Sequence, residues 1–100
     1  MLDKVKMALA LSATTFDTEL SELITAAVLD LKIAEVNSDA VVSEPTDPLI
    51  SRAITSYCVY HFELEHGDQI KAERFKAAYD EQKAQLSMAT GYTTWNAPSN

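Results

Sequence analysis

Residues 46–67 read TDPLISRAITSYCVYHFELEHG, and the local signals in this stretch decide the fold. Asp47 can cap the first N–H groups of a helix, and Pro48 suits the first helical position, where its missing N–H costs nothing. Gly67 supplies the left-handed residue that commonly closes a helix. We therefore expect a long helix from Pro48 to about His66.

Apolar periodicity predicts three further helices around this one. They are expected over about residues 2–11, residues 17–36 with Asp17 or Thr18 as the cap, and residues 69–88 with Asp68 as the cap. Residues 38–47 lack a helical period and are predicted to form a loop. The fold class is therefore all-α: a small bundle of about four helices over residues 1–91, followed by a C-terminal tail over residues 92–100.

The composition is that of a small globular protein with one modest core. The chain has 100 residues, of which 47% are hydrophobic and two are glycine. No apolar run is long enough to span a bilayer, and the single cysteine cannot form an internal disulfide, which fits a reducing cytoplasm. The net charge of −7, with eight scattered basic residues, argues against a surface that grips phosphates. It suits ordinary solubility, or a surface that DNA passes without binding.

The two middle helices carry more apolar surface than one core requires. On a helical wheel, Val59 and Phe62 lie opposite the main apolar face of the third helix. Leu29, Ile33 and Val36 lie opposite the main stripe of the second. A helix that is apolar on two faces is buried on two faces, either against a neighbouring subunit or within a bundle that wraps it completely. These five residues are the candidates for an interface with a neighbouring subunit or another protein.

No catalytic, metal-binding or cofactor-binding pattern is evident. A pair of Cys58 and His61 can be drawn one helical turn apart, but Cys58 lies at the edge of a very apolar helix, which favours an inert, packed thiol. His61 and His66 are five residues apart, which is not the i, i+4 spacing of two helical zinc ligands. We expect neither an enzyme nor a bound cofactor.

Tyr92 and Trp95 are unusual in an otherwise polar tail. Large aromatic side chains in such a segment either pack back onto the parent domain or are offered to a partner. Both residues are therefore further interface candidates.

Several segments, in order along the chain, resemble head–tail connector proteins of phages, of the HK97-connector type. They are LDKVK at residues 2–6, FDTEL at 16–20, DPLI at 47–50, AITSYC at 53–58 and AERFKAAYDEQKAQLS at 72–87. The resemblance covers about residues 2–92, and it rests on helix patterns rather than on a catalytic signature. The tail beyond Tyr92 departs from the pattern.

The resemblance implies a structural subunit of a homo-oligomeric ring, typically twelvefold, in the neck of the virion. Such a ring docks under the portal protein after DNA packaging, extends the DNA channel and receives the next neck or tail-completion protein. The implied location is the host cytoplasm during assembly and the virion neck afterwards, without membrane contact or specific DNA binding. A small acidic helical regulator, such as an antitoxin or anti-repressor that binds another protein, is the alternative. It accounts for the charge but not for the two-sided helices.

Overall fold

The computed structural model describes residues 1–36 and 39–88, and within them the regular elements are four helices and no strand. The helices are α1 (Leu2–Ala8), α2 (Asp17–Ile33), α3 (Pro48–His66) and α4 (Gln69–Met88). The expected all-α bundle is confirmed. The expected end of the domain at residue 91 and the tail over residues 92–100 lie outside the described residues.

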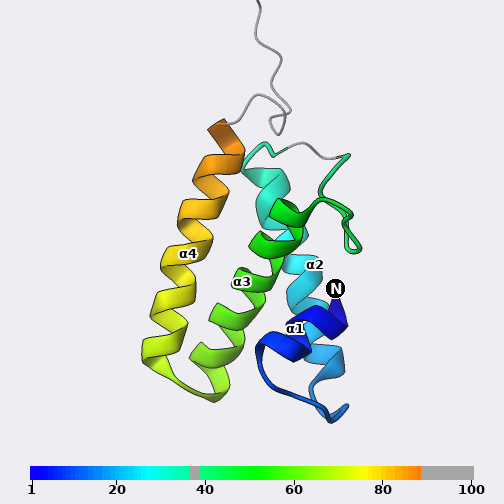
Figure 1. Ribbon diagram of the computed structural model, residues 1–100, viewed down its shortest axis with the longest axis vertical. Coiled ribbons are helices and arrows are strands. Elements are labelled where there is room, and N and C mark those ends of the chain that lie inside the picture. Colours follow the sequence, from blue (N-terminus) through cyan, green and yellow to red (C-terminus); the bar gives the residue numbers. More distant parts are fainter. Residues whose placement is uncertain (37–38, 89–100) are drawn as a thin grey trace, which may run out of the picture.

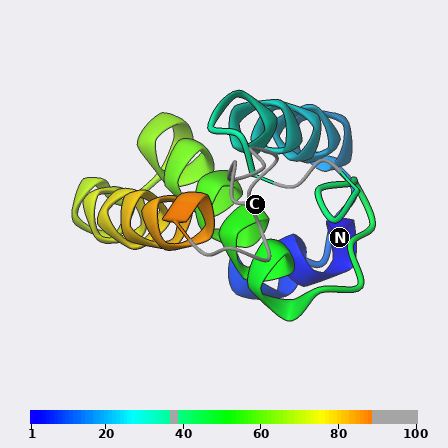
Figure 2. The ribbon, with the colours of Figure 1, turned by 90° about the horizontal axis from the view of Figure 1, so that it is seen from above.

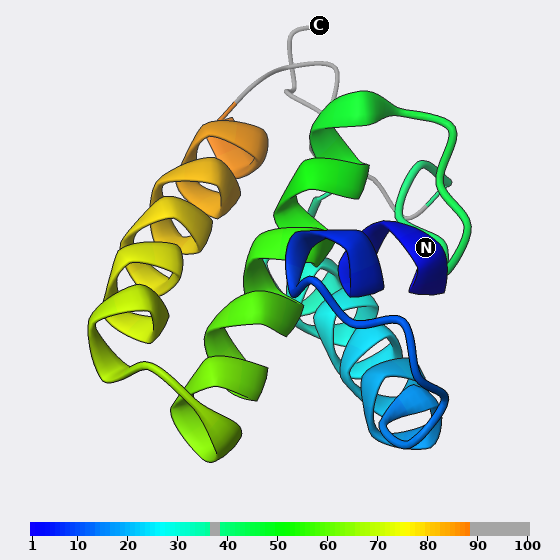
Figure 3. The ribbon, with the colours of Figure 1, turned by 60° about the horizontal axis from the view of Figure 1, so that its bottom comes forward.

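Helix α3 is the centre of the molecule, with α4 along one side and α2 along another (Figure 1). Figure 3 shows α1 crossing α3 and α2. Seen from above, α4 lies at one edge, and α1 and α2 lie beyond α3 (Figure 2). Because α3 has neighbours on several sides, most of its apolar residues are enclosed within one subunit.

Local signals set the start of α3 and the start of α4. The Asp47 carboxylate accepts a hydrogen bond from Leu49 N–H at 2.8 Å, and Pro48 is the first helical residue. The Asp68 carboxylate accepts hydrogen bonds from the N–H groups of Ile70 and Lys71 at the start of α4. Both caps were expected from the sequence.

Two expected helix ends are corrected. Gly67 has φ −148° and ψ −120°, so it is not left-handed, and its N–H donates to the carbonyl of Glu63. At the start of α2 the cap position is Phe16, which makes no side-chain capping bond. Asp17 is the first helical residue, and it pairs with Lys6 of α1 at 2.8 Å. That ion pair joins two helices, which a capping bond would not do.

Helices α1 and α2 end before residues 11 and 36, because a left-handed residue closes each of them. Glu35 has φ 63°, and the N–H groups of Glu35 and Val36 bond to the carbonyls of Lys32 and Leu31. Ala10, with φ 57°, closes α1 with the same bonding pattern. This pattern is the Schellman motif, which commonly brings the residue after the left-handed one back against the helix. Val36 is accordingly fully buried.

The core collects residues from all four helices and from the loop before α3. Its buried apolar residues include Val5, Leu20, Ile24, Leu31, Val41, Ile50, Ile54, Val59, Phe62, Tyr79 and Leu86. One face of α4 packs on this core, since Ala72, Tyr79 and Leu86 are buried. No helix within the described residues is long and apolar enough to cross a membrane.

Candidate interaction surface

The structure divides the predicted interface candidates into two groups. Leu29 and Ile33 on α2 are exposed, with 55% and 80% of their surface accessible. Val36, Val59 and Phe62 are instead buried, and Phe62 is only 5% exposed. Tyr92 and Trp95 lie outside the described residues. Packing against the parent domain and docking on a partner both stay predictions for them.

The second apolar face of α3 belongs to the subunit's own core, which corrects the expectation that it meets a neighbour. The Phe62 ring meets the Phe16 ring edge to face, with centroids 5.0 Å apart. Val59 is fully buried, and α1 crosses α3 and α2 (Figure 3). The short first helix and the segment after it thus enclose apolar surface that a wheel of α3 alone leaves open.

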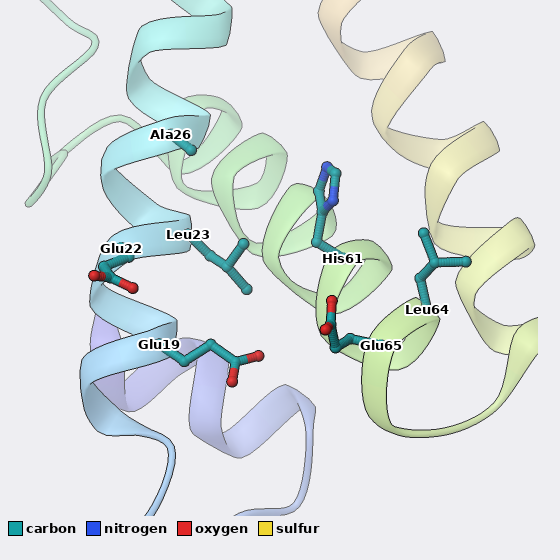
Figure 4. A pocket seen from close by; sticks show the side chains of 7 residues that line it. All are labelled: Glu19, Glu22, Leu23, Ala26, His61, Leu64 and Glu65. Carbon is teal, nitrogen blue, oxygen red and sulfur yellow. The ribbon is translucent and has the colours of Figure 1, made fainter.

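A groove lies between the first half of α2 and the last half of α3 (Figure 4). Its volume is about 470 Å³, and it is lined by Glu19, Glu22, Leu23, Ala26, His61, Leu64 and Glu65. The apolar part consists of two leucines and an alanine, and three carboxylates surround it. Glu19 is engaged within the subunit, because His66 Nε2 lies 2.7 Å from Glu19 Oε2. Among the described residues, Glu22 and Glu65 form no ion pair.

Next to this groove, a polar cluster connects α2 to α4. Tyr79 donates a hydrogen bond to the Asp30 carboxylate at 2.5 Å, and Lys83 donates to the same oxygen at 3.2 Å. His61 lines both the groove and the smaller hollow around this cluster. Because α4 otherwise packs mainly on α3, these two bonds help to fix its position relative to α2.

Burial and charge shift the titrations within this cluster. Burial by itself would raise the pKa of Asp30, but the hydrogen bonds from Tyr79 and Lys83 outweigh it, and the pKa of Asp30 is lowered. Burial and the neighbouring Asp30 carboxylate raise the pKa of the Tyr79 hydroxyl well above its usual value. Burial lowers the pKa of His61, although Asp30 opposes the shift. At neutral pH the cluster is thus an Asp30 carboxylate bound by a phenol and an ammonium, with a neutral His61 beside it.

The Cys58 thiol is not placed to act as a nucleophile. Burial raises the pKa of the Cys58 thiol to about 12, so the reactive thiolate is strongly disfavoured at neutral pH. The same side chain is fully buried, which agrees with the predicted packed cysteine. No group of three or more histidine, cysteine or acidic residues within residues 1–36 and 39–88 is placed to bind a metal ion.

Sequence patterns do not reveal the groove or the Asp30–Tyr79–Lys83 cluster. Tyr79 lies on α4, and Asp30 lies on α2, 49 positions earlier in the chain. Only the packing of α2 and α4 against α3 brings them together.

A family model described as phage connector protein matches residues 1–93. No curated protein and no solved structure matches the chain.

Proposed function

We propose that this chain, which belongs to the phage connector protein family, is a structural, non-enzymatic subunit of a homo-oligomeric ring in the virion neck. The ring joins the portal protein to the tail or to the next neck protein and extends the DNA channel after packaging. Its assembly takes place in the host cytoplasm. Twelve subunits are expected in the virion.

The exposed apolar residues on α2 are the observation that carries this proposal. Leu29 and Ile33 lie one turn apart on the side of α2 opposite its buried residues. Isolated apolar side chains are common on protein surfaces, but adjacent ones beside an apolar groove indicate a protein-binding surface. A ring subunit needs such surfaces, because each copy contacts two neighbours and a portal.

The acidic balance suits a channel that DNA moves through. A lumen rich in lysine and arginine would bind phosphates and slow the passage of DNA, since each neutralised phosphate adds salt-dependent affinity. A net charge of −7 avoids that binding. The absence of specific DNA contacts is therefore part of the proposal.

Direct observation of assembly tests this function. The protein, alone and mixed with purified portal protein, is analysed by sedimentation velocity and negative-stain microscopy. Closed rings, or a stable complex with the portal, are expected. A protein that remains a monomer or dimer and does not bind the portal would refute the connector role and favour the small regulator considered above.

Tyr92 and Trp95 are proposed to dock on the portal or on a neighbouring subunit. Fluorescence of the single tryptophan tests this placement. Emission typical of an exposed tryptophan in the free protein, shifting to the blue on portal binding, is expected. A blue, quencher-protected signal in the free subunit would show that Trp95 is already buried there and would refute docking.

A further inference from the structure

The outward side of α2 carries a continuous stripe of four residues. Two of them line the groove, and the other two are large and apolar. Glu22, Ala26, Leu29 and Ile33 are spaced by four, three and four residues, so they share one side of the helix. We call them the α2 stripe. Ala26 is partly exposed and the other three are exposed. Glu22 and Ala26 also line the groove, which therefore continues into the exposed Leu29 and Ile33.

The outward side of α4 carries a second stripe that begins with an isoleucine and a cation. Its exposed members are Ile70, Arg74, Ala77, Glu81 and Ala84, spaced by four, three, four and three residues. We call them the α4 stripe. Ile70 is 71% exposed at the start of the helix. Because the buried Ala72 and Tyr79 face α3, the α4 stripe points away from the subunit.

The two stripes carry opposite charges at corresponding ends. The chain has eight basic residues, and Lys4, Lys6, Lys76 and Lys83 each bind a polar group of the same subunit. Of the others, Lys71 and Arg74 lie one turn apart beside Ile70, and neither forms an ion pair among the described residues. The groove offers Glu22 and Glu65, which form no ion pair within residues 1–36 and 39–88. Ile70 carries Lys71 and Arg74 on one side and Glu73 on the other, so its cationic side matches the carboxylates of the groove.

Length and direction match as well. Helices α2 and α4 both begin at the end of the molecule where α3 turns into α4, and both run toward the other end (Figure 1). At a rise of about 1.5 Å per residue, Glu22 to Ile33 spans about 17 Å and Arg74 to Ala84 about 15 Å.

We propose that the α4 stripe of one subunit packs in parallel against the α2 stripe of the next, with Ile70 entering the groove between Arg74–Glu22 and Lys71–Glu65 contacts. The occupant of the groove is therefore a second copy of this chain. The contact joins two different surfaces, so it repeats head to tail and closes into a ring when the rotation permits. It rests on the proposed ring function, and it identifies the faces through which neighbouring subunits meet.

Reciprocal charge reversal tests the contact. One variant carries Lys71→Glu and Arg74→Glu, and the other carries Glu22→Lys and Glu65→Lys. Each alone places like charges across the contact, and the assembled fraction in sedimentation velocity should fall at least about tenfold at matched concentration. An equimolar mixture restores opposite charges at every contact and should again form rings, now with alternating subunits. Unchanged circular dichroism melting of each variant confirms that the subunit itself remains folded.

A control variant separates this contact from a general effect of charge. Lys32→Glu with Arg52→Glu changes the net charge as much as the Lys71 and Arg74 pair does, at the two other cations that form no ion pair among the described residues. It should assemble like the wild type. Rings formed by both reversed variants, or a mixture that fails to assemble, would refute the α2–α4 contact while leaving the ring function intact. A wild-type protein that never assembles, even with portal, would refute both.

Discussion

Truncation of Phe62 measures whether the second apolar face of α3 belongs to the subunit core. The side chain is 5% exposed, and its ring packs edge to face on Phe16 at 5.0 Å. A buried phenylalanine replaced by alanine costs about 3–5 kcal/mol, and an aromatic pair contributes about 0.5–1.5 kcal/mol beyond burial. Phe62 lies near the end of α3, where the surroundings can partly collapse. We therefore expect Phe62→Ala to lower the free energy of unfolding by about 3 kcal/mol.

The assay is urea denaturation followed by far-ultraviolet circular dichroism, supported by thermal melting. In a domain of this size, about 3 kcal/mol corresponds to a decrease in Tm of roughly 12–24 °C. Ile33→Ala is the matched control, because Ile33 is 80% exposed, and it should change the free energy of unfolding by less than about 0.5 kcal/mol. By the same reasoning, Phe62→Asp should unfold the monomer much as Ile54→Asp does. A loss below about 1 kcal/mol for Phe62→Ala would place Phe62 outside the core and return it to the set of interface candidates.

Four further outcomes are expected. The pKa of Asp30 is lower in the folded protein than its ordinary value of 3.8, so the stability that the carboxylate contributes is present above that value and is lost as the pH falls through the folded pKa. The Tm difference between wild type and Asp30→Asn should therefore shrink on acidification. A difference that grows would contradict this assignment. Ala10→Gly should raise the free energy of unfolding by about 0.5–1 kcal/mol in urea titrations, because φ 57° strains alanine but not glycine. A lower free energy of unfolding would show that the strain at Ala10 is negligible. Cys58 should react with a thiol reagent only on unfolding, since it is buried and its pKa is raised to about 12, and rapid labelling of the native protein would refute this. Finally, a net charge of −7 predicts no sub-micromolar binding of duplex DNA at physiological salt in a mobility-shift assay.

The sequence by itself determined the parts of the structure that depend on neighbouring residues. Asp47, Pro48 and Asp68 mark the start of α3 and α4 because capping is a local interaction of a side chain with N–H groups two or three residues away. The apolar periods of α2 and α4 predicted their main buried faces for the same reason. In α3 the prediction was wrong at both ends of the face, because Leu49 and Leu64 are exposed. The ordered helix patterns also carried the resemblance to the phage connectors, which the family match over residues 1–93 confirms.

Only the tertiary structure decided which second face is enclosed and which remains exposed. A helical wheel treats Ile33 and Phe62 alike, because it contains no information about the other helices. In the folded subunit α1 and the Phe16 ring enclose the far side of α3, while Leu29 and Ile33 stay exposed within the part of the chain that the structure describes. Val36 is buried because Glu35 adopts a left-handed conformation and turns the chain back toward the core. Burial depends on the position of every neighbouring element, so the exposed apolar surface followed from the packing of the four helices.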